Sequence, residues 1–216
     1  MKINTSCPVL VTGATGYIAG WVVKNLLDKG ITVHAPIRNL SNKEKRVHLD
    51  ELAKNSSGKI KYFESDLLIE NSYKEAMEGC ELVIHTASPF IMDSKDPQKE
   101  VIDPALIGTQ NILKTVNEIE SVKRVVLTSS VAAIYGNSID AQSVDGGMFN
   151  ESMWNTTSTA TDGEYSFSKA IAEKEAWRIN EEQKRWDLIV INPSFVLGPS
   201  LNPDAMFESK KFMLQM

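Results

Sequence analysis

Residues 8–20 read Pro8-Val9-Leu10-Val11-Thr12-Gly13-Ala14-Thr15-Gly16-Tyr17-Ile18-Ala19-Gly20. The apolar run over 8–12 predicts a short buried strand, and the glycines after it predict a tight turn. Apolar residues at helical spacing predict a helix over 17–29, which Gly30 terminates. A buried strand, a glycine turn and a helix in this order are typical of the first unit of a parallel α/β fold.

The same alternation continues along the chain. Short apolar runs predict further strands over 31–37, 60–64, 81–86, 124–129 and 187–192. Amphipathic segments predict helices over 43–54, 70–77, 104–119 and 165–183. Parallel strands this rich in Val, Ile and Leu are buried on both faces. We therefore expect an α/β fold, a Rossmann-type doubly wound parallel sheet with helices on both faces.

Two segments stand outside this alternation. Residues 136–163 are polar and predict a long functional loop rather than a linker. Residues 207–216 have the pattern of an amphipathic helix.

Composition excludes several classes of protein. The chain has 216 residues, with 23 basic and 28 acidic side chains, and this slightly acidic balance argues against nucleic-acid binding. It has no apolar run of about 18 residues and no signal-peptide pattern, so we expect no membrane span. Cys7 and Cys80 lack metal-ligand spacing with the three histidines, which favours reduced thiols in a cytoplasmic protein and no metal site.

The glycine turn indicates a phosphate site. Gly13 and Gly16 allow close approach of a pyrophosphate, and backbone N–H groups at the start of the helix can face its oxygens. Ala19 is the third small residue, so the spacing is G-x-x-G-x-x-A rather than G-x-G-x-x-G. The alternative is a plain strand–helix turn. Placement directly after the first strand favours a dinucleotide.

The end of the second predicted strand indicates which dinucleotide binds. An acidic residue there usually accepts the ribose 2′-hydroxyl of NAD, but residues 34–38 contain none. Arg38 can instead pair with a 2′-phosphate, and Lys43 or Lys45 can add positive charge. The alternative is that these cations are solvated surface residues. The pattern predicts NADPH.

Later strand ends supply further candidate contacts. Asp66 and Leu67 follow the third strand, where a carboxylate and a backbone N–H can meet adenine. Thr86, Ala87 and Ser88 follow the fourth, where small residues let the chain pass beneath the nicotinamide ribose. Parallel strands end at the same edge of a sheet, so these residues are expected to lie near the glycine turn.

A tyrosine and a lysine on the helix over 165–183 indicate acid–base chemistry. Tyr165 and Lys169 are four residues apart and share one helix face, so the ammonium favours the phenolate. Such a tyrosine can give a proton to a carbonyl oxygen as hydride arrives. Ser130, at the end of the fifth strand, is the candidate to hydrogen-bond that oxygen, and Ser129 faces either the core or the cofactor.

Six motifs in this order resemble the extended short-chain dehydrogenase/reductase family, and most closely its dihydroflavonol-reductase-like branch, with methylglyoxal and aldehyde/ketone reductases. They are TGATGYIA (12–19), DL (66–67), HTASP (85–89), TSS (128–130), YSFSK (165–169) and NPSFVLGP (192–199). The resemblance runs from about residue 9 to 211. Some members carry an Asn where Ala105 stands, so no catalytic Asn is predicted.

The resemblance implies that Ser130, Tyr165 and Lys169 form a catalytic triad, with Lys169 also holding the nicotinamide ribose. It implies a set of residues in contact with the cofactor: Gly13, Thr15, Gly16, Tyr17, Ile18, Arg38, Lys45, Asp66, Leu67, Thr86, Ala87, Ser88, Tyr165, Lys169, Pro193, Val196 and Ser209. Members of this branch continue into a smaller substrate-binding domain. On that basis residues 1–199 are the NAD(P)-binding domain with the catalytic residues, and 200–216 the start of a substrate-binding region that is largely absent here.

The expected function is reduction of an aldehyde or ketone by NADPH, with Tyr165 as proton donor, in a monomer or homodimer. Two alternatives stay open. One is a nucleotide-sugar epimerase or dehydratase that keeps its nicotinamide bound, and the other is a dinucleotide-binding fragment without catalysis. A set of apolar residues either walls the site for the carbonyl substrate or serves packing alone: Phe90, Met148, Phe149, Met153 and Trp154.

Overall fold

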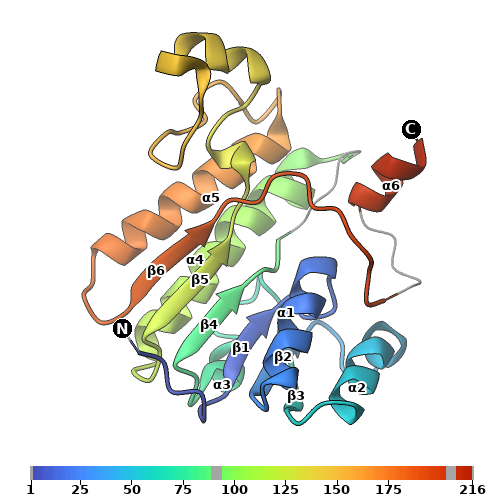
Figure 1. Cartoon of the computed structure of the whole chain (residues 1–216). Helices are drawn as coiled ribbons and strands as arrows, with labels where there is room; N and C mark the ends of the chain where they lie inside the picture. Colours follow the sequence, from blue (N-terminus) through green and yellow to red (C-terminus); the bar gives the residue numbers. More distant parts are fainter. Residues whose placement is uncertain (1, 89–93, 203–207, 216) are drawn as a thin grey trace.

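The computed structural model describes residues 2–88, 94–202 and 208–215. Within them, six parallel strands form one sheet in the order β3-β2-β1-β4-β5-β6 (Figure 1). The strands are β1 (Val9–Thr12), β2 (Thr32–Ile37), β3 (Lys59–Glu64), β4 (Leu82–His85), β5 (Arg124–Thr128) and β6 (Asp187–Ile191). The strand order reverses between β1 and β4, and a crevice forms beyond the carboxyl ends of strands at such a point. The predicted Rossmann-type sheet is confirmed.

Helices cover both faces of this sheet. α1 (Tyr17–Asp28) and α2 (Val47–Lys54) pack on one face, and α3 (Lys74–Met77), α4 (Asp103–Glu118) and α5 (Glu164–Glu181) pack on the other. Along β1, Val9 and Val11 belong to the α1 core and Leu10 to the α4 core. Because both faces are buried, these three consecutive strand residues are all apolar. α6 (Glu208–Gln215) follows the segment that leaves β6.

Two predicted helices differ from the structure. The helix over 43–54 begins as a 3₁₀ turn, Glu44–Arg46, before α2. The helix predicted over 70–77 is wrong in extent, because α3 is a single turn. Asn71 has φ of 62°, a left-handed conformation that interrupts a helix, and Ser72 donates its hydroxyl to the Asp66 carbonyl (2.6 Å) instead. This bend keeps Asp66 and Leu67 at the end of β3.

The long loop over 136–163 contains two 3₁₀ segments, Ser138–Ser143 and Asp145–Gly147, and lies beyond the N-terminal end of α5 (Figure 1). Asp140 fixes the loop, since its carboxylate accepts hydrogen bonds from the Asn137 N–H (3.0 Å) and the Thr157 hydroxyl (2.8 Å). Internal hydrogen bonds of this kind hold the loop in a defined conformation.

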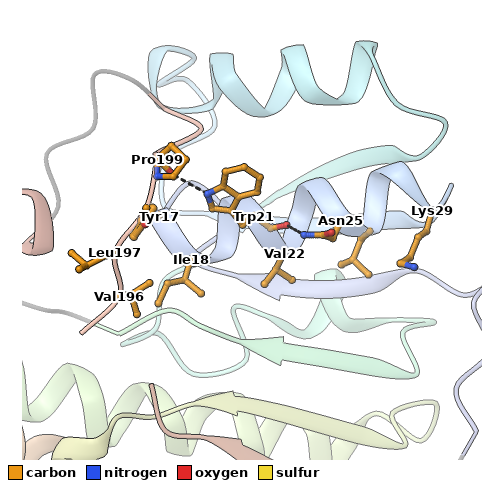
Figure 2. A pocket seen from close by; sticks show the side chains of 11 residues that line it. Tyr17, Ile18, Trp21, Val22, Asn25, Lys29, Val196, Leu197 and Pro199 are labelled. Atoms are coloured by element: carbon orange, nitrogen blue, oxygen red, sulfur yellow. Dashed lines mark hydrogen bonds between the residues drawn. The ribbon is translucent and has the colours of Figure 1, made fainter. Parts of the chain in front are cut away.

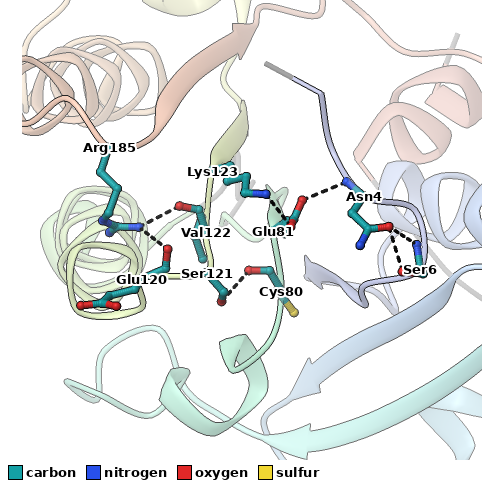
Figure 3. Close-up of polar contacts among 9 residues, drawn as sticks. All are labelled: Asn4, Ser6, Cys80, Glu81, Glu120, Ser121, Val122, Lys123 and Arg185. Atoms are coloured by element: carbon teal, nitrogen blue, oxygen red, sulfur yellow. Dashed lines mark hydrogen bonds and ion pairs between the residues drawn. The ribbon is translucent and has the colours of Figure 1, made fainter.

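A polar network closes the amino end of the sheet (Figure 3). The carboxylate of Glu81, just before β4, accepts bonds from the Asn4 N–H (2.9 Å) and the Lys123 ammonium (2.6 Å). Arg185, just before β6, donates to the Ile119 (2.9 Å) and Val122 (2.7 Å) carbonyls beyond the end of α4. Cys80 lies beside this network as a free thiol, and burial raises its pKa to about 12.

None of the helices in residues 2–88, 94–202 and 208–215 has the length and apolar character needed to cross a bilayer.

Candidate active site

A cleft of about 890 Å³ opens at the carboxyl edge of the sheet, where segments from the ends of all six strands converge. It brings together most of the residues predicted from the sequence: Gly13, Thr15, Gly16, Tyr17, Ile18, Arg38, Asp66, Leu67, Thr86, Ala87, Ser88, Ser130, Tyr165, Pro193 and Val196. Lys45 and Lys169 do not line it. Lys45 is exposed on the 3₁₀ turn before α2, and Lys169 is buried behind Tyr165. The Ser209 side chain lies outside the described residues.

The glycine turn is shaped by strand register. Thr12 aligns with His85 across β1 and β4, so Gly13 leaves the sheet beside Thr86. Gly13 has φ of 67°, and a Cβ there would lie 3.0 Å from the Ala87 Cα. Gly13 is therefore needed both for its backbone conformation and for the close approach of the segment after β4.

The first turn of α1 suits an anion. Gly16 begins the helix without a side-chain cap, and no acidic residue occupies the first turn. Free N–H groups at a helix N-terminus attract phosphate oxygens. Two buried hydroxyl groups that line the same cleft, Thr86 Oγ1 and Ser129 Oγ, also have no hydrogen-bond partner among the described residues. A polar ligand rich in phosphate and hydroxyl groups fits these donors and acceptors.

Thr12, which was not predicted as a site residue, positions the backbone of the segment after β4. Its hydroxyl oxygen accepts the N–H groups of Thr86 and Ala87 (3.0 Å each) and pairs with His85 Nδ1 (2.8 Å). Because both lone pairs of the Thr12 hydroxyl oxygen accept these N–H groups, its proton is left for His85, and Nδ1 is the acceptor. Burial, assisted by the charge of Lys169, lowers the pKa of His85 to about 3, so the imidazole is neutral.

The end of the cleft near β2 and β3 carries opposite charges. Arg38 is exposed after β2, and the charges of Arg38 and Asp66 act in opposite directions on the pKa of buried Tyr73. Leu67 is fixed against α4, because Asn111 donates to its carbonyl (2.7 Å) and a Cβ on Gly108 would lie 3.2 Å from its Cβ. Arg38, Lys43 and Lys45 were the cations predicted for the 2′-phosphate. Of these three, Arg38 lines the cleft.

Ser130, Tyr165 and Lys169 converge at the other end. The Tyr165 hydroxyl is hydrogen-bonded to the Ser130 side chain, which lowers its pKa, whereas burial raises that pKa and has the larger effect. Lys169 Nζ lies 5.5 Å from the centroid of the Tyr165 ring. The Lys169 side chain is 7% exposed, and burial lowers its pKa to about 8. Ser130 and Tyr165 thus line this end of the cleft, and Lys169 lies buried behind Tyr165.

A second cavity, of about 440 Å³, lies inside the long loop. Phe149, Met153 and Trp154 line it, and Phe149 stacks on Tyr135 with ring centroids 4.4 Å apart. Met148 is 75% exposed and is not among the lining residues, and Phe90 lies outside the described residues. These three residues can either form a wall of the substrate site or pack the loop alone.

A third hollow, of about 530 Å³, runs along the outer face of α1 (Figure 2). At one end the Trp21 indole donates to the Pro199 carbonyl (2.9 Å), which holds the segment after β6 against the helix. Gly198 has φ of 150°, and a Cβ there would lie 3.1 Å from the Tyr17 hydroxyl. These contacts place Val196 next to the start of α1, at the cleft.

The chain is similar to several reductases. Cinnamoyl-CoA reductase CAD2 of Medicago truncatula is 42% identical over 203 residues, which cover 93% of this chain and 61% of that protein. Anthocyanidin reductase ((2S)-flavan-3-ol-forming) of Vitis vinifera is 38% identical over 206 residues, covering 93% of this chain and 58% of that protein.

The crystal structure of Gre2 from Candida albicans in complex with NADPH gives a TM-score of 0.77 at 33% identity, covering 90% of this chain and 59% of Gre2. The chain thus spans about 60% of the length of these relatives. The sequence profile of the NAD dependent epimerase/dehydratase family matches residues 9–216, and the chain belongs to that family.

Proposed function

We propose that this chain forms the cofactor-binding and catalytic part of an NADPH-dependent oxidoreductase that reduces an aldehyde or ketone to an alcohol. The observation that carries the proposal is the convergence of Ser130, Tyr165 and Lys169 at one end of the cleft. The reductases among the relatives support the reaction class. The whole protein's substrate is part of this proposal, since the chain spans about 60% of those relatives.

The residues present fit a dinucleotide, which supplies a hydride when bound. The start of α1 and Gly13 would receive the pyrophosphate, and Arg38 would pair with the 2′-phosphate. Asp66 and Leu67 would meet adenine, and Thr86, Ala87 and Ser88 would pass beneath the nicotinamide ribose. Pro193 and Val196, held by the contacts between the segment after β6 and α1, would border the nicotinamide.

The chain's own chemistry then concerns one oxygen atom. Ser130 and Tyr165 hydroxyls would hydrogen-bond the substrate carbonyl oxygen and polarise its bond. Tyr165 would give its proton to that oxygen as the carbonyl carbon is reduced. The Lys169 cation favours the resulting phenolate, which burial alone would disfavour. Since His85 is neutral, it is not an acid that competes with Tyr165 in this proton transfer.

Two other functions remain candidates. The match to a family named for epimerases and dehydratases favours a sugar-modifying enzyme, which would keep its nicotinamide bound and consume none. The second candidate is dinucleotide binding without turnover, for which the cleft that receives the cofactor would suffice.

The test is NADPH oxidation measured over a panel of aldehydes, α-dicarbonyls and aryl ketones, together with NADPH binding followed by fluorescence. We expect stoichiometric NADPH consumption with at least one carbonyl, and a loss of about 10³-fold in kcat for Tyr165→Phe. Tyr62→Phe removes a hydroxyl on β3 that bonds to Asp50 and does not line the cleft, and it should keep kcat. NADPH binding without NADPH consumption supports dinucleotide binding without turnover. Full activity in Tyr165→Phe contradicts Tyr165 as the proton donor.

A further inference from the structure

A buried carboxylate that the chemistry above does not use lies next to the catalytic lysine. Glu173 is on α5, four residues after Lys169 and therefore on the same helix face. It is 6% exposed, in a position where an apolar residue would avoid the cost of desolvating a charge. Because burying a carboxylate costs free energy of desolvation, we expect Glu173 to have a role beyond packing.

The contacts of Glu173 connect three elements of the site. Its Oε2 accepts a hydrogen bond from Asn192 Nδ2 (2.7 Å), and Asn192 directly follows β6. The same Asn192 amide also donates to the Ser130 carbonyl (3.1 Å), beyond the end of β5. The register supports this bridge, because Thr128 aligns with Ile191 and the two strands end side by side. Glu173 is thus linked to Ser130 through one amide group.

The electrostatic contact of Glu173 is with Lys169. Burial drives the pKa of Lys169 down, and the charge of Glu173 opposes that shift. Among the described residues, His85 on β4 and Tyr165 on α5 also lie near Lys169, and both are uncharged near neutral pH. The ammonium therefore owes its proton near neutral pH in part to Glu173.

We propose that Glu173 and Asn192 are positioning residues of the site: Glu173 keeps Lys169 cationic, and Asn192 couples Glu173 to the Ser130 backbone so that the triad is held as one unit. The catalytic meaning of this rests on the function proposed above. The contacts themselves do not, and they can be tested without turnover.

The first test follows Lys169 directly, in protein without cofactor. In protein labelled with ¹³Cε-lysine, the Lys169 resonance is assigned by its loss in Lys169→Arg and titrated by NMR. Glu173→Gln keeps the shape of the side chain and an acceptor for Asn192 but removes the charge. We expect its Lys169 titration to move at least about one pH unit lower than in the wild type. The matched control is Glu175→Gln, which removes a carboxylate that pairs with Arg178 on the same helix, and it should leave the titration unchanged.

The second test uses turnover and separates charge from bridging. Glu173→Gln should move the high-pH limb of kcat/KM to lower pH in step with the NMR titration. Asn192→Ala should lower kcat about tenfold at all pH values and leave the limb in place. A purely structural role would lower the melting temperature of Glu173→Gln without moving either titration.

Each outcome is decisive. An unmoved Lys169 titration in Glu173→Gln overturns the charge role, and an unchanged kcat in Asn192→Ala overturns the bridge. If Glu173→Gln does not fold, Glu173→Asp keeps the charge and should hold the titration within about half a pH unit of the wild type. Failure of both to fold, while Glu175→Gln folds, also overturns the proposal by making Glu173 structural. A wild type that oxidises no NADPH contradicts the proposed function alone, since the NMR test still stands.

Discussion

The two ends of the sheet differ in how far their polar groups are satisfied by hydrogen bonds. At the amino end, Glu81 and Arg185 bond to partners from neighbouring elements (Figure 3). At the carboxyl end, Thr86 Oγ1 and Ser129 Oγ are buried without a partner in the part of the chain that the structure describes, and the start of α1 has no side-chain cap. Unsatisfied buried groups cost free energy of folding. One end of the same sheet therefore contributes stability, and the other reserves its hydrogen bonds for a ligand.

The largest expected effect is at the carboxyl end, from Gly13→Ala. The added Cβ would lie 3.0 Å from the Ala87 Cα in a residue with φ of 67°, so the turn has to move. We expect NADPH affinity to fall at least about 100-fold, since strain and overpacking each cost about 1–3 kcal/mol. Fluorescence titration measures it. Gly79→Ala shares a positive φ but has open space around it, and should leave affinity unchanged. Equal losses in both variants would show that strain alone, not the contact with Ala87, is responsible.

Some features of the carboxyl end could be predicted from the sequence, and others could not. The glycine turn, the strand ends and the Tyr165–Lys169 pair follow from local pattern, because each is a short motif at the end of a strand. Glu173 and Asn192 could not be identified in this way, since their contact depends on how α5 packs beside β6. Lys45 was predicted at the cleft and lies outside its lining, because a 3₁₀ turn precedes α2. The bend at Asn71 has no strong sequence signal either.

The second effect is a pH dependence at the carboxyl end. The unfolded chain keeps the Lys169 proton up to an ordinary pKa of 10.5, whereas the folded protein loses it near pH 8. Between these values the unfolded state binds more protons, so stability rises with pH. We expect a gain of about 2–3 kcal/mol in wild type relative to Lys169→Arg, whose side chain does not titrate. Denaturant unfolding at pH 7.5 and pH 10 measures it. Parallel curves for the two proteins would contradict the lowered pKa.

A smaller effect is expected at the amino end from Arg185→Ala. Arg185 donates to carbonyls beyond the last turn of α4, where a cation also complements the helix dipole. Its removal should lower the free energy of unfolding by about 2 kcal/mol, measured by denaturant titration, and leave NADPH affinity unchanged. Arg178→Ala is the control, since that arginine is half-exposed and pairs only with Glu175 and Glu182 among the described residues. Its removal should change the free energy of unfolding far less, because solvent screens exposed ion pairs. A loss of cofactor affinity in Arg185→Ala would show that the two ends are coupled.

The smallest expected effect is at Thr12, which shares features with both ends of the sheet. Its hydroxyl is fully satisfied, like the groups at the amino end, yet it lies in the carboxyl half and fixes the N–H groups of Thr86 and Ala87. Thr12→Val keeps the side-chain shape and leaves those N–H groups without that partner, at a cost of about 1–2 kcal/mol. Because the unpaired groups lie at the cofactor cleft, KM for NADPH should rise about fivefold to tenfold. Thr12→Ser retains the hydroxyl and should keep the wild-type KM. A wild-type KM in Thr12→Val together with a raised KM in Thr12→Ser would show that the methyl group rather than the hydrogen bonds positions this segment, and that the satisfied hydroxyl at the carboxyl end serves stability as the polar groups at the amino end do.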